Sequence, residues 1–389
     1  MTNNLLDISN IDMPDDLPKI QFYKDPDSYE IACSLFEACN LKCKFCFEGH
    51  RNNKIDIDYI RQIPFNVMDA IRKDFKVYQN IKDVNIRLWG GELFFDGLKD
   101  EIFDEYRLFV DTFNNMFKKE FPNIVLKYSW LTNGVFTKWE RVKDILDYSN
   151  GTIGFSYDPS GRFSTQKQKE LMIENVKRFY NMGYFNCLSI TLTKKTIEEY
   201  VSGNSDIKAL ELGERYDINF YTANPNWKEL IPTDEDMFKF FKWGLDNDLY
   251  YINVISQLVN SVINEGKYIP QHYCDCKTCV QYSNGCATVD CVKRASVLPR
   301  EMFYGKYTDI ITEENVSDIK LSMGMIKRGC LTCEYFNRCQ MPCWVSVIFE
   351  GYQPTDCPYR QAHKYIENNP EIIARYKQWV ETNKSNYQQ

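Results

Sequence analysis

One short run of sequence, CNLKCKFC at residues 39–46, places Cys39, Cys43 and Cys46 in the pattern C-x3-C-x2-C. Three thiolates this close in sequence can converge on one face of a compact iron–sulfur cluster, and the motif has no fourth cysteine, so one iron stays open. An open coordination position is typical of a catalytic metal centre, whereas structural zinc takes four protein ligands. The alternative is a zinc loop completed by His50.

Cysteine and histidine usage around this motif favours bound metal over disulfides. The chain of 389 residues holds 15 cysteines and only three histidines. Residues 1–19 lack the basic and apolar regions of a signal peptide, and no apolar run is long enough to span a bilayer. We therefore expect a cytoplasmic protein with no membrane association, in which thiols stay reduced and cysteine clusters bind metal.

The overall composition is that of a globular protein. Hydrophobic residues make up 44% and charged residues 26% of the chain, a balance that argues against disorder. The net charge of −7 lacks the basic surplus with which general nucleic-acid binders neutralise phosphates. We expect no nucleic-acid partner.

The cysteine motif directly follows the first of six β-rich runs that alternate with amphipathic, helix-like stretches. The six runs are 31–36, 84–89, 124–131, 152–157, 186–192 and 218–222. This alternation predicts successive βαβ units, an α/β fold and a parallel sheet that forms a partial (β/α)6 TIM-like barrel. In such folds the chemistry gathers on the loops after the carboxyl ends of the strands.

The composition divides the chain into segments. Ten of the 15 cysteines lie between residues 271 and 357, where the βαβ rhythm has ended. The predicted organisation is an N-terminal leader segment 1–28, a barrel 29–232, a helical bridge 233–270, a cysteine-rich domain 271–361 and a C-terminal segment 362–389 with a helix at 370–380.

The C-x3-C-x2-C motif, with Phe45 just before its third cysteine, resembles the signature of the radical S-adenosylmethionine (radical SAM) enzymes. The resemblance implies a 4Fe-4S cluster held by Cys39, Cys43 and Cys46. Its open iron would chelate S-adenosylmethionine, whose reductive cleavage yields a 5′-deoxyadenosyl radical that removes a hydrogen atom from the substrate. The backbone near Phe45 would contact the adenine.

Two further segments resemble cofactor-binding positions of that family. Gly90-Gly91-Glu92 follows the second predicted strand, where the glycines allow close backbone approach and the carboxylate can pair with the cofactor's ammonium group. Ser156 ends the fourth strand and would contact the ribose or methionine moiety. An ordinary strand-end serine is the alternative for Ser156. Residues 131–134 are also similar to the family, although Asn-Gly is foremost a turn signal.

The cysteine-rich segment resembles a SPASM domain, an extension of peptide-modifying radical SAM enzymes that carries two auxiliary 4Fe-4S clusters. Its pattern, C-x2-C-x5-C-x3-C…C, comprises Cys330, Cys333, Cys339, Cys343 and Cys357. The resemblance implies that Cys343 ligates the inner cluster and that the other four hold the outer one. A pair of structural zinc sites is the alternative, because tetrahedral thiolate sites suit either metal.

The ligands of the inner cluster stay open between several upstream cysteines. At most three of the following five cysteines can be ligands of the inner cluster: Cys274, Cys276, Cys279, Cys286 and Cys291. Five residues separate Gly285 from the last of these, one more than in the family pattern. Residues 283–285, Ser-Asn-Gly, predict a hairpin turn between two strands, where a bulge could absorb the extra residue.

The resemblance implies an oxidoreductase that matures a ribosomally made peptide, with S-adenosylmethionine and three 4Fe-4S clusters as cofactors. Hydrogen abstraction from the peptide would lead to a cross-link or a similar oxidative modification. The implied partners are the peptide or protein substrate, an external electron donor such as flavodoxin or ferredoxin, and a separate leader-binding protein. Only about thirty residues precede the first strand, too few for a leader-binding domain, so we expect any leader recognition to come from the barrel, the SPASM surface or that separate partner.

Three further functions are compatible with the sequence. The first is that of an anaerobic sulfatase-maturing enzyme, which forms formylglycine, but that group places an aspartate base after the inner-cluster cysteine, whereas here Val292 follows Cys291 and Asp290 precedes it. Asp290 is therefore the one candidate catalytic residue. The second is a small-molecule dehydrogenase with the same clusters, and the third is a non-catalytic zinc or iron–sulfur binding protein.

Overall fold

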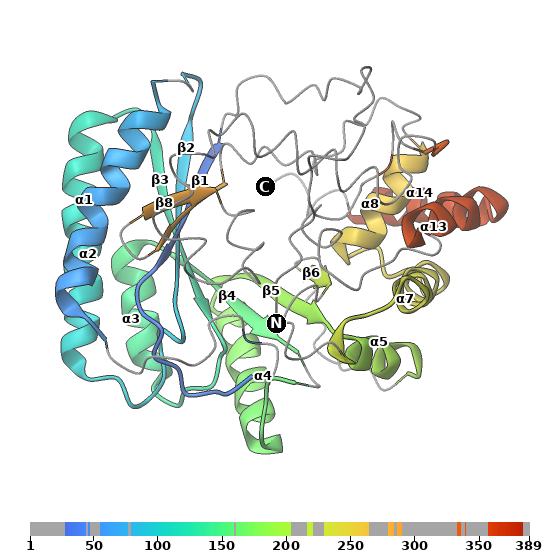
Figure 1. The fold of residues 1–389 in the computed structure, drawn as a ribbon, viewed down its shortest axis with the longest axis horizontal. Helices are drawn as coiled ribbons and strands as arrows, with labels where there is room; N and C mark the ends of the chain where they lie inside the picture. Colours follow the sequence, from blue (N-terminus) through green and yellow to red (C-terminus); the bar gives the residue numbers. More distant parts are fainter. Residues whose placement is uncertain are drawn as a thin grey trace, which may run out of the picture.

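The computed structural model shows a parallel sheet covered by helices (Figure 1). It describes residues 28–43, 46, 55–76, 79–158, 161–203, 216–220, 229–263, 279–283, 286–289, 333–335, 339 and 357–383. The strand order in the sheet is β6-β5-β4-β3-β2-β1-β7-β8. Neighbours from β1 to β6 are consecutive in sequence and parallel, which is the arrangement that successive βαβ units produce.

All six predicted strands are present. They are β1 (Ser28–Ser34), β2 (Asp83–Trp89), β3 (Val125–Thr132), β4 (Thr152–Tyr157), β5 (Phe185–Leu192) and β6 (Tyr216–Phe220). The α/β class and the partial barrel are thereby confirmed. Because the strands are parallel, their carboxyl ends meet at one edge of the sheet.

In the described ranges, five helices lie between these strands along the chain. They are α1 (Ile57–Asp74), α2 (Asp100–Glu120), α3 (Trp139–Ser149), α4 (Gln166–Asn181) and α5 (Lys194–Val201). Side-chain caps fix several of their starts: the Asp56 side chain accepts from the Tyr59 amide, and Thr165 and Gln168 form a capping box at α4. In Figure 1, α1 to α3 lie together beside the strands β1 to β3.

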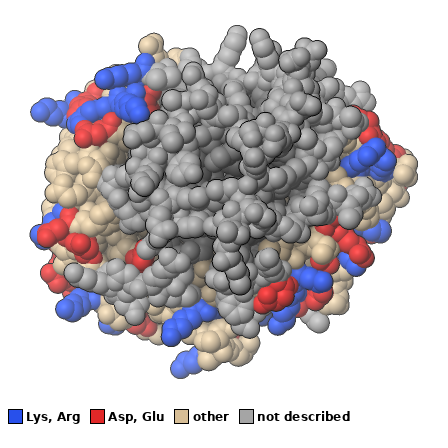
Figure 2. All heavy atoms as spheres, viewed as in Figure 1, with Lys and Arg blue, Asp and Glu red and all other residues tan. Residues whose placement is uncertain are grey.

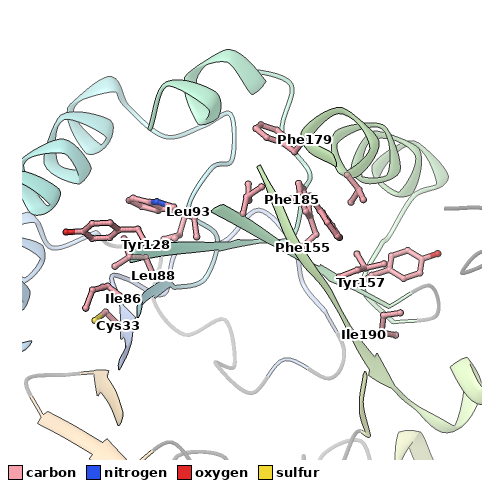
Figure 3. Close-up of a cluster of buried hydrophobic side chains, with 14 of the residues drawn as sticks. Cys33, Ile86, Leu88, Leu93, Tyr128, Phe155, Tyr157, Phe179, Phe185 and Ile190 are labelled. Atoms are coloured by element: carbon pink, nitrogen blue, oxygen red, sulfur yellow. The ribbon is translucent and has the colours of Figure 1, made fainter. Parts of the chain in front are cut away.

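The core lies between this sheet and its helices, and aromatic side chains fill much of it. Figure 3 shows Phe155 of β4 and Phe185 of β5 beneath Phe179 of α4. The ring centroids of Phe155 and Phe185 are 6.2 Å apart, and those of Phe155 and Phe179 are 6.1 Å apart. Tyr128 of β3 and Cys33 of β1 are buried in the same core, so Cys33 is a structural thiol.

Within the predicted helical bridge 233–270 the structure describes two helices, α7 (Asp234–Asp246) and α8 (Asn253–Ile263). The break occurs where Asp248 adopts a left-handed conformation with φ 54°, and the Leu249 amide donates to the Gly244 carbonyl at 3.0 Å. The predicted C-terminal helix is α14 (Glu371–Asn383), and α13 (Pro358–Asn368) precedes it. In Figure 1 these four helices form a group on the side of the molecule opposite α1 and α2.

A hairpin from the cysteine-rich segment extends the sheet past β1. Its strands are β7 (Cys279–Ser283) and β8 (Cys286–Val289), which pair in antiparallel register with Ser283 opposite Cys286. Both strands of the predicted hairpin are therefore present, and residues 284 and 285 between them lie outside the described residues. β7 runs parallel to β1, with Glu30 opposite Cys279, so β1 is an inner strand with a neighbour on each side.

The described surface carries charges of both signs. On the face in Figure 2, Lys and Arg side chains lie beside Asp and Glu side chains around the rim. Several are ion pairs within a helix, such as Lys239 with Glu235 at 2.7 Å. No helix in the described ranges is both long enough and apolar enough to cross a bilayer.

The aromatic row of α2 provides a test of the core. Phe113 is fully buried and its ring lies 6.3 Å from that of Phe109 and 5.8 Å from that of Phe117. Phe113→Ala should lower the free energy of unfolding by about 3–5 kcal/mol because it leaves a cavity between two rings. Chemical denaturation measures this. The control is Phe65→Ala on α1, whose side chain is 48% exposed and whose loss should cost about 0.5 kcal/mol or less.

Candidate functional site

The three cysteines of the first motif lie on the loop that leaves the carboxyl end of β1. Cys43 is buried, with 8% of its surface exposed, and Cys39 and Cys46 are half-buried. All three pack with Leu41 in a small apolar cluster that is separate from the main core. The Cys46 amide donates to the Cys43 carbonyl at 3.1 Å, which turns the loop back on itself. The structure therefore brings the predicted cluster ligands together.

Burial disfavours ionisation of the Cys39 and Cys43 thiols when no metal is bound. Burial and, to a smaller extent, the charges of Glu92, Cys43 and Cys46 raise the pKa of Cys39 to about 12, although the hydrogen bond from the Leu41 amide lowers it. Burial also raises the pKa of Cys43. Metal binding at these thiols would release protons, because only thiolates are ligands.

The two glycines after β2 let the cysteine loop pack directly on the end of that strand. A Cβ atom on Gly90 would lie 2.6 Å from the Phe36 carbonyl oxygen, and one on Gly91 would lie 2.2 Å from the Glu37 carbonyl oxygen. The Gly91 amide donates to the Phe36 carbonyl at 2.7 Å. The close approach that the sequence predicts at these glycines is therefore made by the chain's own backbone at residues 36–38.

The Glu92 carboxylate is buried at the centre of the site, with 2% of the residue exposed. Its Oε1 accepts from the Thr132 hydroxyl at 2.5 Å and from the Phe94 amide at 2.9 Å, and its Oε2 accepts from the Asn133 amide at 2.5 Å. A carboxylate can accept about four hydrogen bonds, so these three donors leave room for one more. Burial raises the pKa of Glu92, while the hydrogen bonds and the Arg162 charge oppose that shift.

Asn133 joins the end of β3 to the cysteine loop. Its side-chain Nδ2 donates to Asn40 Oδ1 at 2.8 Å and lies 3.9 Å from Cys39 Sγ. The Asn40 side chain in turn donates to the Val135 carbonyl at 2.8 Å. The sequence predicts residues 131–134 mainly as a turn and does not predict this contact, because the contact depends on which strands are neighbours in the sheet.

The loop after β4 adds charged groups near the same thiols. Ser156 is half-buried near the end of β4, opposite Ser189 of β5. Beyond it Asp158 is fully buried, and its carboxylate accepts from the Gly161 amide at 3.0 Å. Arg162 lies beside Cys43, whose thiol donates to the Arg162 carbonyl at 3.8 Å, and its charge opposes the burial that raises the pKa of Cys43 and of Glu92. The sequence holds no signal for Arg162. Phe45 and His50 lie outside the described residues.

Part of the second cysteine motif lies where α13 begins. Cys339 is buried in the core, and Cys333 and Cys357 are half-buried and pack against that core. The Cys339 amide donates to the Tyr335 carbonyl at 2.7 Å. Burial raises the pKa of Cys333, and the nearby Cys357 raises it further.

The remaining predicted ligands are only partly described. Cys279 begins β7, and its side chain lies outside the described residues. The other predicted site residues outside the described ranges are Cys274, Cys276, Asp290, Cys291, Cys330 and Cys343.

The donor set of the first loop fits an iron–sulfur cluster. Within the residues that the structure describes, no three Cys, His, Asp or Glu side chains are arranged to hold one metal ion. In a 4Fe-4S cluster each thiolate binds a different iron atom. The sulfur ligands of such a cluster are therefore farther apart than the ligands of a single metal ion. Three thiols around one small loop, with a buried carboxylate and a guanidinium beside them, suit such a cluster together with a zwitterionic ligand.

Comparisons with known proteins find similarity at the level of structure. No protein-family model and no curated protein matches the sequence. The solved structure "Native anSMEcpe with bound AdoMet and Cp18Cys peptide" is 16% identical and aligns with a TM-score of 0.58 over 90% of this chain and 99% of that chain. A polyhistidine-tagged form of anSMEcpe with bound AdoMet is also 16% identical and aligns with a TM-score of 0.60 over 91% of this chain and 96% of that chain.

A third structure, Streptococcus suis SuiB, is 17% identical and aligns over 85% of this chain and 76% of that chain. Its TM-score is 0.48. At these identities the likeness to anSMEcpe shows a shared fold. That fold agrees with the one that the sequence motifs imply.

The contacts of Glu92 generate a stability prediction. The Gln side chain of Glu92→Gln has one NH2 group, which must face either the Asn133 amide or the Thr132 hydroxyl and the Phe94 amide. In either orientation a donor faces another donor, so at least one hydrogen bond is lost. We expect the free energy of unfolding to fall by about 1–3 kcal/mol, measured by chemical denaturation.

The matched control is Glu120→Gln. Glu120 is exposed and pairs with Arg72, and such surface pairs contribute about 1 kcal/mol or less. Equal stability of Glu92→Gln and the unmodified protein would contradict a role for Glu92 in holding the two strand ends together.

Proposed function

We propose that this chain is a radical SAM enzyme that oxidatively modifies a peptide. The observation that carries the proposal is the gathering of Cys39, Cys43 and Cys46 beside the buried Glu92 carboxylate at the carboxyl ends of β1 and β2. The fold shared with anSMEcpe supports it, because that protein is described with bound AdoMet.

Each part of the site has a role in this proposal. The three thiolates would hold a 4Fe-4S cluster and leave one iron open for S-adenosylmethionine. Glu92 keeps one acceptor position that suits an ammonium group, and Arg162 is a cation that suits a carboxylate. Together the bound groups would supply the radical chemistry that removes a hydrogen atom from the substrate. Ser156, Phe45 and the backbone at Gly90 and Gly91 complete the proposed cofactor contacts.

The proposed substrate is a ribosomally made peptide that receives a cross-link or a similar modification. The anSMEcpe structure contains a Cp18Cys peptide, which supports a peptide as the class of substrate. In this proposal residues 271–361 form an auxiliary-cluster domain, and Cys333, Cys339 and Cys357 belong to its outer cluster. An external electron donor and a leader-binding partner are part of the same proposal.

A second candidate is formylglycine formation in a sulfatase, as in an anaerobic sulfatase-maturing enzyme. The observation in its favour is the alignment with anSMEcpe over 99% of that chain. Against it, Val292 stands where that group has its aspartate base, so Asp290 would have to serve from the other side of Cys291. We rank peptide cross-linking first.

Joint replacement of Cys39, Cys43 and Cys46 by Ala tests the assignment of the first cluster. Anaerobically reconstituted protein should carry about eleven to twelve irons per chain, and the variant about four fewer. Formation of 5′-deoxyadenosine under reducing conditions should be abolished. The fold should persist because the loop lies outside the main core, and circular dichroism checks this.

Cys187→Ala is the matched control, since Cys187 lies half-buried on β5 and is not a predicted ligand. It should keep both the iron content and the activity. Undiminished 5′-deoxyadenosine in the triple variant would refute the proposal, and stoichiometric zinc with about four irons would refute the auxiliary clusters alone.

Product analysis separates the two candidate reactions. A cross-linking maturase should remove a pair of hydrogens from a short peptide encoded beside its gene, without gain of oxygen, as measured by mass spectrometry. A sulfatase-like Cys or Ser peptide should stay unchanged. If formylglycine forms instead, Asp290→Asn should slow it by about a hundredfold or more, because a positioned base is lost. That outcome would replace the first candidate by the second.

A further inference from the structure

We propose that Asn133 is a positioning residue that donates a hydrogen bond to the Cys39 sulfur and thereby raises the reduction potential of the cluster that Cys39 would hold. The inference rests on the proposed function, and it deepens that function by assigning a residue that tunes the site. It is carried by the contacts that fix the Asn133 side chain.

Those contacts allow one orientation of the Asn133 amide. Its Oδ1 accepts from the Val135 amide at 2.9 Å, so its Nδ2 must point the other way. On that side Nδ2 donates to Asn40 Oδ1 at 2.8 Å and lies 3.9 Å from Cys39 Sγ. Exchanging the positions of Oδ1 and Nδ2, which often cannot be told apart in an asparagine side chain, would here break the hydrogen bonds to the Val135 amide and to Asn40 Oδ1.

The position of Asn133 is also fixed through its backbone. Its amide donates to Glu92 Oε2 at 2.5 Å, and only 4% of the residue is exposed. The residue therefore lies between the buried carboxylate and the Cys39 thiol. A hydrogen bond in such a water-poor site is stronger than one at the surface.

A second donor reaches the same sulfur. The Leu41 amide lies 3.4 Å from Cys39 Sγ. Cys39 Sγ therefore has a side-chain N–H donor as well as a backbone donor. Hydrogen bonds to cluster sulfurs stabilise the reduced, more negative state, so removing this donor should make the cluster harder to reduce.

Asn133→Ser tests this inference in the full-length reconstituted protein. A serine hydroxyl can still accept from the Val135 amide and stays neutral, but it is too short to reach Cys39. The readout is a potentiometric titration followed by electron paramagnetic resonance, restricted to the signal that changes when S-adenosylmethionine is added. At a fixed potential we expect the ratio of reduced to oxidised cluster to fall by about threefold to tenfold, where tenfold corresponds to 59 mV for one electron.

Asn40→Ala is the matched control. Asn40 is exposed, and its loss removes the brace to Val135 while the Asn133 amide still faces Cys39. Its cluster should titrate like that of the unmodified protein. If Asn40→Ala shifts the titration as much as Asn133→Ser, the effect comes from loosening of the loop and the inference is overturned.

A second variant tests the inference if Asn133→Ser does not assemble the cluster. Asn133→Asp keeps the size of the side chain and the acceptor for Val135, but replaces the donor by an oxygen, so its shift should have the same sign and be larger. Unchanged titration in both variants would overturn the inference while leaving the proposed function intact. Absence of any signal that responds to S-adenosylmethionine in the unmodified protein would overturn the proposed function itself, and the inference with it.

Discussion

Burial of the Glu92 carboxylate is the constraint on which the arrangement of the site depends. A charged group removed from water must find donors in the protein, and those donors come from Phe94 in its own loop and from Thr132 and Asn133 after the next strand. The carboxylate therefore fastens the ends of β2 and β3 to each other. The Glu92 amide also donates to the Ala38 carbonyl at 2.8 Å, which brings the end of β1 into the same assembly.

The cysteine loop begins as a continuation of the parallel ladder. Beyond the last paired residues of β1 and β2, the Leu35 amide donates to the Trp89 carbonyl at 2.9 Å, and the Gly91 amide donates to the Phe36 carbonyl. Side chains at Gly90 and Gly91 would collide with this continuation. Backbone hydrogen bonds thus fix the loop up to the residue before Cys39, and such a fixed backbone suits the proposed role of its three cysteines as ligands of one cluster.

The sequence predicts the elements of this fold well and their long-range contacts poorly. The six strands are found because β-rich runs and helical periodicity are local properties, and the pairing of β7 with β8 is found because Asn-Gly is a local hairpin signal. The pairing of β7 with β1 is a contact between distant segments that no local pattern encodes. Arg162 was missed for the same reason, since only the folded chain brings its charge near Glu92 and Cys43.

The position of β1 between β2 and β7 has a consequence for the order of folding. Residue 30 pairs on one side with residue 85 and on the other with residue 279. Both edges of β1 can therefore be paired only after most of the chain has been synthesised. Until then it presents an open edge during translation, and pairing between such distant residues is slow. The strand that leads into the cysteine loop is thus completed only when the cysteine-rich segment arrives, which makes the two halves of the protein interdependent in folding.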